Sequence, residues 1–190
     1  MGSGVHSCIN VVWIAVFAVW AIGGLTTKQT ARAQSRGSRL IQTFFFILAF
    51  LLLFRNEPRT GWFGRRFLPP SLWGDYTGLA LTVAGAGFAI WARFALGRNW
   101  SGTVTVKQDH TLIRTGPYAV VRHPIYAGFL LAILGTTIAI GEIRGLAATV
   151  SALIGMKLKA QLEEEFMMEQ FGEEYAQYKR EVKGIIPFVW

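Results

Sequence analysis

Apolar residues in this chain lie in long blocks separated by short polar and basic stretches. Five such blocks can be read from the sequence, at 9–25, 40–54, 79–96, 125–140 and 143–158. Several are shorter than the roughly 20 residues with which a helix crosses a bilayer, and flanking aromatic residues extend them to the interface. The pattern therefore predicts an all-α integral membrane protein with about five transmembrane helices.

The fourth and fifth blocks are separated only by Gly141 and Glu142. A connection this short predicts an antiparallel hairpin, so the fifth block returns to the membrane side where the fourth begins. Small residues in the third block, among them Gly78 and Gly85, would let a neighbouring backbone approach closely. Arg93, near the end of that block, is expected to anchor at the membrane surface in preference to facing a polar cavity.

The pattern changes after residue 158, where glutamates become frequent and apolar residues recur at helical spacing. We expect an amphipathic C-terminal helix that leaves the fifth block, with Gly172 as its candidate break. The apolar positions that define its face are Leu162, Phe166, Met167, Phe171, Tyr175 and Tyr178.

Composition supports a single membrane domain. Of the 190 residues, 52% are hydrophobic and 16% charged, which is typical of a membrane protein. No linker rich in Pro, Ser and Gly divides the chain, so residues 1–190 are predicted to form one domain. Cys8 is the only cysteine, so neither an internal disulfide nor a thiolate metal cage is available, and no metal site is predicted.

The formal net charge of +8 points to membrane lipids rather than nucleic acid, because the Lys and Arg residues lie beside apolar blocks. With five spans, the first loop, the third loop and the C-terminal tail share one side and carry most of these residues. The positive-inside rule therefore predicts that this side faces the cytosol. Arginines within 55–66, on the other side, weaken the asymmetry without reversing it.

Arg122, His123 and Pro124 directly precede the fourth block. Proline suits the first turn of a helix and disfavours helix in the residue before it, so His123 is predicted to be the N-cap. The positive end of the helix dipole should keep its imidazole neutral. With Arg122, the first-turn N–H groups would accept a carboxylate or phosphate. The triplet alone is equally compatible with an interfacial anchor.

A second polar group lies at the exit of the fifth block. Lys159 and Glu163 are four residues apart and share a helix face, with Glu164 beside them. The hairpin predicts that this face returns towards His123. Charged groups this close to hydrocarbon need partners, so they either pair with one another or bind a polar ligand.

Two stretches of the chain carry a family resemblance: GRNWSGTVTVKQDHTLIRTGPYAVVRHPIYAGFLLAILG and KLKAQLEEEFMMEQFGEEYAQYKREVKGIIP. In their order and spacing they resemble the isoprenylcysteine carboxyl methyltransferase family, within the wider group that includes phospholipid N-methyltransferases. The resemblance covers roughly 93–187. It identifies 93–190 as a cofactor-binding and catalytic half of the domain, preceded by N-terminal spans in 1–92.

The resemblance implies a membrane enzyme that uses S-adenosylmethionine and releases S-adenosylhomocysteine. Its cofactor pocket would lie at the cytosolic face, under the amphipathic helix, and a lipophilic substrate would enter from the bilayer. The catalytic positions would be Arg122, which suits the cofactor's carboxylate, Glu163, which suits its ammonium or ribose hydroxyls, and Glu164, which completes an acidic pair. The positions implied to line the cofactor are Lys107, His110, Thr111, Leu112, Ile113, Tyr118, His123, Pro124, Ile125, Tyr126 and Glu163.

Lys159 stands where the family usually has an arginine thought to engage substrate. An ammonium cannot clamp a carboxylate with two parallel hydrogen bonds, so this departure bears on the substrate more than on the cofactor. The expected reaction is carboxyl O-methylation of a prenylated, isoprenylcysteine-like or other lipophilic molecule. Three alternatives stay open: a phospholipid amine N-methyltransferase with Glu164 as candidate base, a non-catalytic membrane protein that keeps the fold, and a membrane reductase with a nicotinamide cofactor.

Overall fold

The computed structural model of the protein describes residues 3–24, 30–54, 61–97, 100, 105–107 and 111–186. Its helices are α1 (Ser3–Gly24), α2 (Arg36–Phe54), α3 (Leu72–Leu96), α4 (Pro124–Ile140), α5 (Ile143–Phe171) and α6 (Glu173–Glu181), with the short 3₁₀ helices η1 (Trp62–Gly64) and η3 (Gly116–Ala119). Two short strands, β1 (Thr30–Ala33) and β2 (Thr105–Lys107), form a small sheet.

The predicted all-α membrane fold is confirmed at the level of its helices. Among the described residues, α1 over Gly4–Gly24, α2 and α3 are long and apolar enough to cross a membrane, whereas the apolar α4 has 17 residues. Helix α5 runs for 29 residues through both the apolar fifth block and the polar stretch after it. Lys, Gln and Glu are good helix formers, so the helix continues where hydropathy ends. It stops before the predicted break at Gly172, and the number of spans stays a prediction.

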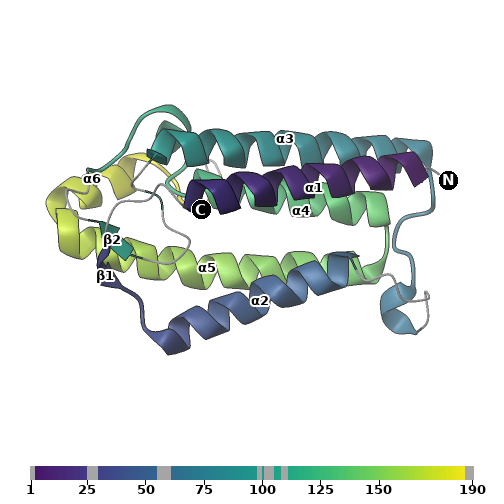
Figure 1. Cartoon of the computed structure of the whole chain (residues 1–190), viewed down its shortest axis with the longest axis horizontal. Helices are drawn as coiled ribbons and strands as arrows, with labels where there is room; N and C mark the ends of the chain where they lie inside the picture. The colour runs from purple at the N-terminus through teal and green to yellow at the C-terminus, as the bar shows by residue number, and fades with distance from the viewer. Residues whose placement is uncertain are drawn as a thin grey trace.

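The helices form two layers, with α1, α3 and α4 in one and α2 and α5 in the other (Figure 1). Within the first layer, α3 packs closely along α4. A Cβ added at Gly85 would lie 2.4 Å from the backbone nitrogen of Ala132, and one added at Gly135 would lie 2.5 Å from that of Thr82. The predicted close approach at small residues is therefore confirmed.

Hydrogen bonds in the apolar core tie α1 to the α3–α4 pair. The Trp13 Nε1 group donates to Thr136 Oγ1 at 3.0 Å, and Thr136 Oγ1 lies 3.2 Å from Thr82 Oγ1, within hydrogen-bond distance. Trp13, Thr82 and Thr136 are all buried. Their polar atoms need partners because hydrocarbon supplies none, and these bonds fix the register of the layer.

The predicted α4–α5 hairpin is present. Gly141 ends α4 with φ of 64°, in the left-handed region that favours glycine. The Glu142 side chain is buried, and its Oε2 accepts from Arg144 Nε at 2.6 Å. Arg144 Nη1 also donates to the Leu52 carbonyl at 3.0 Å, so the hairpin holds the end of α2 as well.

The opposite end of the bundle collects the first loop, the third loop and the C-terminal helix. Strand β1 pairs antiparallel with β2, with Thr30 opposite Lys107 and Ala33 opposite Thr105. Figure 1 shows these strands beside α6, at the end of α5. The prediction that the two loops and the tail share one side is thus consistent with the fold, while the compartment they face stays a prediction.

Arg93 is not the interfacial anchor that we expected. Its side chain is 4% exposed, with Nη2 donating to the Gly23 carbonyl at 2.7 Å and Nη1 to the Gly97 carbonyl at 2.9 Å. The guanidinium also lies 4.2 Å from the centroid of the Trp100 ring. The unsatisfied carbonyls at the ends of α1 and α3 supply acceptors, so the charge is held between helices instead of reaching the surface.

Candidate functional site

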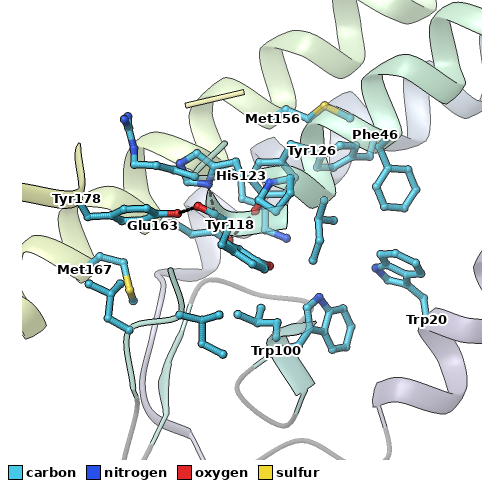
Figure 2. A pocket seen from close by; sticks show the side chains of 18 of the residues that line it. Trp20, Phe46, Trp100, Tyr118, His123, Tyr126, Met156, Glu163, Met167 and Tyr178 are labelled. Carbon is cyan, nitrogen blue, oxygen red and sulfur yellow. Dashed lines mark hydrogen bonds and ion pairs between the residues drawn. The ribbon is translucent and has the colours of Figure 1, made fainter. Parts of the chain in front are cut away.

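A cavity of about 410 Å³ lies where α4 begins, between α1, α2, α5 and α6. Figure 2 shows His123, Glu163, Tyr118 and Tyr178 gathered at one side, and Trp20, Trp100 and Phe46 at the other. The cavity therefore joins a polar side to an aromatic side. The apolar residues that line it include Phe17, Trp20, Phe46, Phe50, Leu96, Trp100, Phe129, Ile133 and Met156.

His123 occupies the N-cap position of α4, as predicted, with Pro124 in the first turn. Its side chain makes no capping bond and instead bridges two glutamates of α5. His123 Nδ1 lies 3.5 Å from Glu163 Oε2, and Nε2 lies 3.1 Å from Glu164 Oε1. The imidazole also stacks on the Tyr126 ring, with 5.5 Å between centroids and 10° between planes.

The prediction of a neutral His123 is wrong in this environment. Burial lowers the pKa of the imidazole, but hydrogen bonds and charge from Glu163 and Glu164 outweigh that effect and raise the pKa above its ordinary value. A helix N-terminus carries only about half an elementary charge. Two nearby carboxylates therefore dominate, and they favour the imidazolium.

Glu163 lies on the cavity wall and links α5 to α4. Its Oε1 accepts a 2.5 Å hydrogen bond from the Tyr126 hydroxyl. Burial raises the pKa of Glu163, yet the His123 hydrogen bond, the Lys159 charge and the Tyr126 bond lower it below the usual value. Lys159 Nζ lies 5.7 Å from the centroid of the Tyr126 ring, so lysine, carboxylate and phenol meet at one wall.

Glu164 faces away from the cavity and towards three cationic side chains. Arg122 donates from Nη2 at 2.6 Å and from Nε at 3.1 Å to Glu164 Oε1, which His123 Nε2 also contacts. Lys179 Nζ lies 2.7 Å from Oε2. Burial raises the pKa of Glu164, but these partners more than offset it and hold the carboxyl ionised. We call Arg122, His123, Tyr126, Lys159, Glu163, Glu164 and Lys179 the polar cluster.

Helix α6 closes the remaining side of the cavity with Tyr175 and Tyr178. The Tyr178 hydroxyl donates to the Tyr118 carbonyl at 2.5 Å, and both side chains are buried. Burial raises the pKa of Tyr178 to about 12, so it stays a neutral donor. The expectation that the C-terminal helix lies over the pocket agrees with these positions.

Most of the residues predicted from the sequence meet at this cavity. Glu164 and Thr111 are described but are not among the residues that line it. Lys107 lies in β2, and His110 falls outside the described residues. The predicted residues that line the cavity are Leu112, Ile113, Tyr118, Arg122, His123, Pro124, Ile125, Tyr126, Lys159 and Glu163.

Sequence reasoning missed the walls contributed by α1 and α2. Phe17 and Trp20 of α1 and Phe46 and Phe50 of α2 line the cavity. Each pair lies three or four residues apart, so it shares a helix face. Phe44 of α2 is 58% exposed, which explains the omission: hydropathy alone does not separate a cavity-facing aromatic from one that faces outwards.

The chain is similar in sequence to protein-S-isoprenylcysteine O-methyltransferases from several eukaryotes. The chain is 33% identical over 120 residues to protein-S-isoprenylcysteine O-methyltransferase of Homo sapiens, a match that covers 62% of this chain and 42% of that protein. It is 35% identical over 98 residues to the Schizosaccharomyces pombe protein of the same name, covering 49% of this chain and 41% of that protein. The chain thus spans less than half the length of these two relatives.

A solved structure of a eukaryotic intramembrane Ras methyltransferase, isoprenylcysteine carboxyl methyltransferase, has a similar fold. The TM-score is 0.66 at 23% identity, and the likeness covers 98% of this chain and 66% of that one. At this identity the likeness concerns the fold, and it supports the helical membrane architecture.

A family model also matches the part of the chain that carries the cavity. The model described as phospholipid methyltransferase matches residues 73–174, from α3 into the start of α6. This range contains all of the polar cluster except Lys179. Because the match covers more than half of the sequence, the resemblance seen in the motifs is confirmed, and the chain belongs to the phospholipid methyltransferase family.

Proposed function

We propose that this protein is an integral membrane methyltransferase that uses S-adenosylmethionine to methylate the carboxylate of a prenylated or otherwise lipophilic acceptor. The observation that carries the proposal is a cavity that joins part of the polar cluster, Arg122, His123, Tyr126, Lys159 and Glu163, to aromatic walls from α1 and α2. The polar side of the cavity suits a charged cofactor, and the aromatic side suits the apolar chain of the acceptor. Family membership and the names of the relatives support the same reaction.

The residues at the polar side fit S-adenosylmethionine. The cavity volume of about 410 Å³ falls in the range of small-molecule sites. The first-turn N–H groups of α4 suit the cofactor's carboxylate, and Glu163 suits its ammonium or ribose hydroxyls. Apolar and aromatic contacts to the cofactor's adenine would come from Leu112, Ile113 and Tyr118. When bound, the cofactor supplies a methyl group that its sulfonium already activates.

Charge at the cavity favours a carboxylate acceptor. Arg122, Lys159 and His123 line it with Glu163, and Glu164 lies behind this wall, in contact with Arg122 and His123. The two carboxylates raise the pKa of His123, whereas burial lowers the pKa of Lys159. A protonated Lys159 would attract an anionic acceptor to this wall. A carboxylate needs alignment more than it needs a base, and alignment alone can contribute about 7 to 11 kcal/mol to a displacement.

Lys159 presents an ammonium, which attracts a carboxylate as a point charge. An arginine guanidinium would instead bind a carboxylate with two parallel hydrogen bonds. Lys159 lies beside Tyr126 and Glu163, in a cavity whose lining also includes Met156 and Ile133. We infer that Lys159 contacts the acceptor's carboxylate and that the aromatic walls receive its chain from the bilayer. The basic first loop, third loop and tail support a cytosolic position for this end of the bundle.

A phospholipid amine is the second candidate acceptor, because the matching family is described by phospholipid methylation. An ammonium would have to lose a proton before it could attack. Glu164 was the candidate base, yet its oxygens are engaged by Arg122, His123 and Lys179, and its pKa is lowered. Both features make it a poor proton acceptor, which argues for the carboxylate.

Methyl incorporation separates these functions. Membranes that contain the protein are supplied with methyl-labelled S-adenosylmethionine and an N-acylated S-prenylcysteine that has a free carboxylate. We expect label in the prenylcysteine that mild alkali releases as methanol, because a methyl ester hydrolyses under those conditions. Alkali-stable label in membrane lipid would instead identify the amine methyltransferase. Competition by a nicotinamide cofactor would indicate a reductase.

The cofactor site can be tested separately from the reaction. Purified protein should bind S-adenosylhomocysteine in a calorimetric titration, and Tyr126→Ala or Glu163→Ala should weaken that binding at least tenfold, about 1.4 kcal/mol. Glu165→Gln is the matched control, since Glu165 is the exposed neighbour of the acidic pair. Unchanged affinity in both site variants would contradict the assignment. A folded wild type without affinity would point to the non-catalytic alternative.

A further inference from the structure

Glu164 is the centre of an ion cluster whose members come from separate parts of the chain. Arg122 precedes α4, His123 caps it, and Lys179 belongs to α6. Their contacts to the Glu164 carboxylate measure 2.6, 3.1 and 2.7 Å, respectively. The Glu164 side chain is 15% exposed and is not part of the described cavity wall. Its contacts join the start of α4 to the C-terminal helix.

The same arginine also holds the end of the described chain. We use the term C-terminal strap for residues 173–186, which comprise α6 and the segment after it. Arg122 Nη1 donates to the carbonyl of Lys179 at 3.2 Å and also to that of Val182. In addition, the backbone N–H of Arg122 donates to the Lys183 carbonyl at 2.7 Å, and that of His123 to the Gly184 carbonyl at 3.0 Å.

The strap forms part of the cavity. Tyr175 and Tyr178 line it, and the Tyr178 hydroxyl bonds to the Tyr118 carbonyl beside it. Ile185, beyond α6, is 2% exposed and belongs to the hydrophobic core. Displacement of the strap would therefore remove two aromatic side chains from the wall that faces the proposed cofactor.

We propose that Arg122 and Glu164 are positioning residues that hold the C-terminal strap against the cavity. Arg122 uses its guanidinium on Glu164 and on two strap carbonyls at once, and Glu164 holds Lys179 of the strap directly. A planar guanidinium with several fixed donors suits this bridging task better than a lysine. Removal of either partner leaves the other charges of a partly buried cluster without compensation.

The inference deepens the proposed function, since the strap's two tyrosines would complete the cofactor site. It also separates the two glutamates, which are adjacent in sequence. Glu163 lies on the cavity wall and bonds to Tyr126, whereas Glu164 acts through the strap. Consecutive helical residues point about 100° apart, so one helix can place one carboxylate in the cavity and its neighbour behind it.

The test uses the full chain in lipid nanodiscs and two readouts. Hydrogen exchange of residues 173–186 reports on the strap without any ligand, and calorimetry reports on S-adenosylhomocysteine binding. In Arg122→Gln and Glu164→Gln, we expect strap amides to exchange at least ten times faster, with α3 unchanged. The dissociation constant for S-adenosylhomocysteine should rise at least fivefold. Lys179→Gln, which changes a half-exposed side chain, should give a smaller change in the same direction.

Two variants serve as matched controls. Glu165→Gln removes an exposed carboxylate next to Glu164 in α5. Arg180→Gln removes a guanidinium of α6 whose partner is Glu173, both on the exposed face. Neither should alter strap exchange or binding. Equal loss of protection in a control and in Glu164→Gln would overturn the proposal, because the effect would then be general loosening of α5 or α6.

Kinetics separate a positioning role from a catalytic one. If Glu164 positions the strap, Glu164→Gln should raise KM for the cofactor with a smaller effect on kcat. A fall in kcat at unchanged KM, while strap exchange stays at the wild-type rate, would overturn the proposal. If the wild type binds no S-adenosylhomocysteine, the proposed function fails, and hydrogen exchange alone decides about the strap. Faster strap exchange in Arg122→Gln and Glu164→Gln supports their positioning role, and unchanged exchange rejects it.

Discussion

At the scale of single residues, the ionisable side chains of the site contact one another and share partners. His123 contacts one glutamate with each ring nitrogen, and each of those glutamates has further partners. No member can change its protonation without altering the interactions of the next. The ionisation of the polar cluster and the stability of the fold should therefore be coupled, with opposite signs for acids and for histidine.

This coupling predicts a stability maximum near neutral pH. The pKa values of Glu163 and Glu164 are lowered, so the stability they contribute is present above their unfolded value of 4.5 and is lost as pH falls through the folded values. The pKa of His123 is raised, so its contribution is complete below 6.5 and is lost as pH rises through the folded value. Melting temperature measured from pH 2 to 9 should decline at both ends.

The histidine variant provides the check. His123→Gln should remove the alkaline component of the decline. It should reduce the acidic component without abolishing it, because the glutamates lose the His123 hydrogen bond but keep Arg122, Lys179 and Tyr126 as partners. An alkaline decline of wild-type size in His123→Gln would show that another group titrates there. Tyr178, with a pKa raised to about 12, lies too high to produce it.

The residues that form the polar cluster were largely predictable, but their protonation was not. The Arg-His-Pro sequence fixes an N-cap, and the short Gly141–Glu142 connection returns Glu163 to the same end. These are local geometric consequences of the sequence. The charge on His123 depends on the distances to two carboxylates, and the role of Arg122 depends on carbonyls of the tail. Neither distance can be derived from spacing along the chain.

At the scale of helices, the α3–α4 seam sets how closely the first layer packs. Gly85→Ala places a methyl group 2.4 Å from the Ala132 nitrogen, which belongs to backbone and cannot rotate away. The helices would have to separate, and overpacking of this kind costs about 1 to 3 kcal/mol. We expect a lower melting temperature in detergent for the variant.

Gly87→Ala is the control for the seam. Gly87 lies in the same helix, and a Cβ added there meets nothing within 4 Å. Alanine favours helix over glycine by about 1 kcal/mol, so this variant should be neutral or slightly more stable in the same melting assay. If both variants behaved alike, steric exclusion at Gly85 would not be the cause.

The existence of the helices was easier to predict than their faces and ends. Hydropathy located the apolar parts of all five long helices, but it divided α5 at residue 158, where backbone hydrogen bonding continues. It also gave no orientation for α1 and α2, and in α2 the outward and cavity-facing sides are both aromatic. Trp20 lines the cavity and Phe44 is exposed, although both lie in apolar helices.

At the scale of the whole molecule, the pairing of β1 with β2 gives a testable orientation. The tail and both paired loops should face the cytosol, and the segment before α3 should face the other side. In a Cys8→Ser background, which has no other cysteine, Glu174→Cys should react with an impermeant maleimide only from the cytosolic side. Pro70→Cys should react only from the opposite side, since both positions are exposed.

If Pro70→Cys and Glu174→Cys were both labelled from the same side, this arrangement would be contradicted, because α3 would then not cross the membrane between Pro70 and the paired loops. Labelling with the sides exchanged would keep the fold and invert the orientation. It would also move the proposed cofactor site away from the compartment assigned to it by the basic loops.

The partnership of α2 with α5 has a consequence for synthesis. Helix α2 packs against α5, and the Ser151 hydroxyl of α5 donates to the Phe45 carbonyl of α2. These two residues are 106 positions apart. At ribosomal rates of 5 to 20 residues per second, α2 reaches the bilayer about 5 to 20 s before its partner is made. During that interval lipid must solvate the face of α2 that α5 later covers. The nascent protein therefore depends on lipid contacts that contacts with α5 later replace.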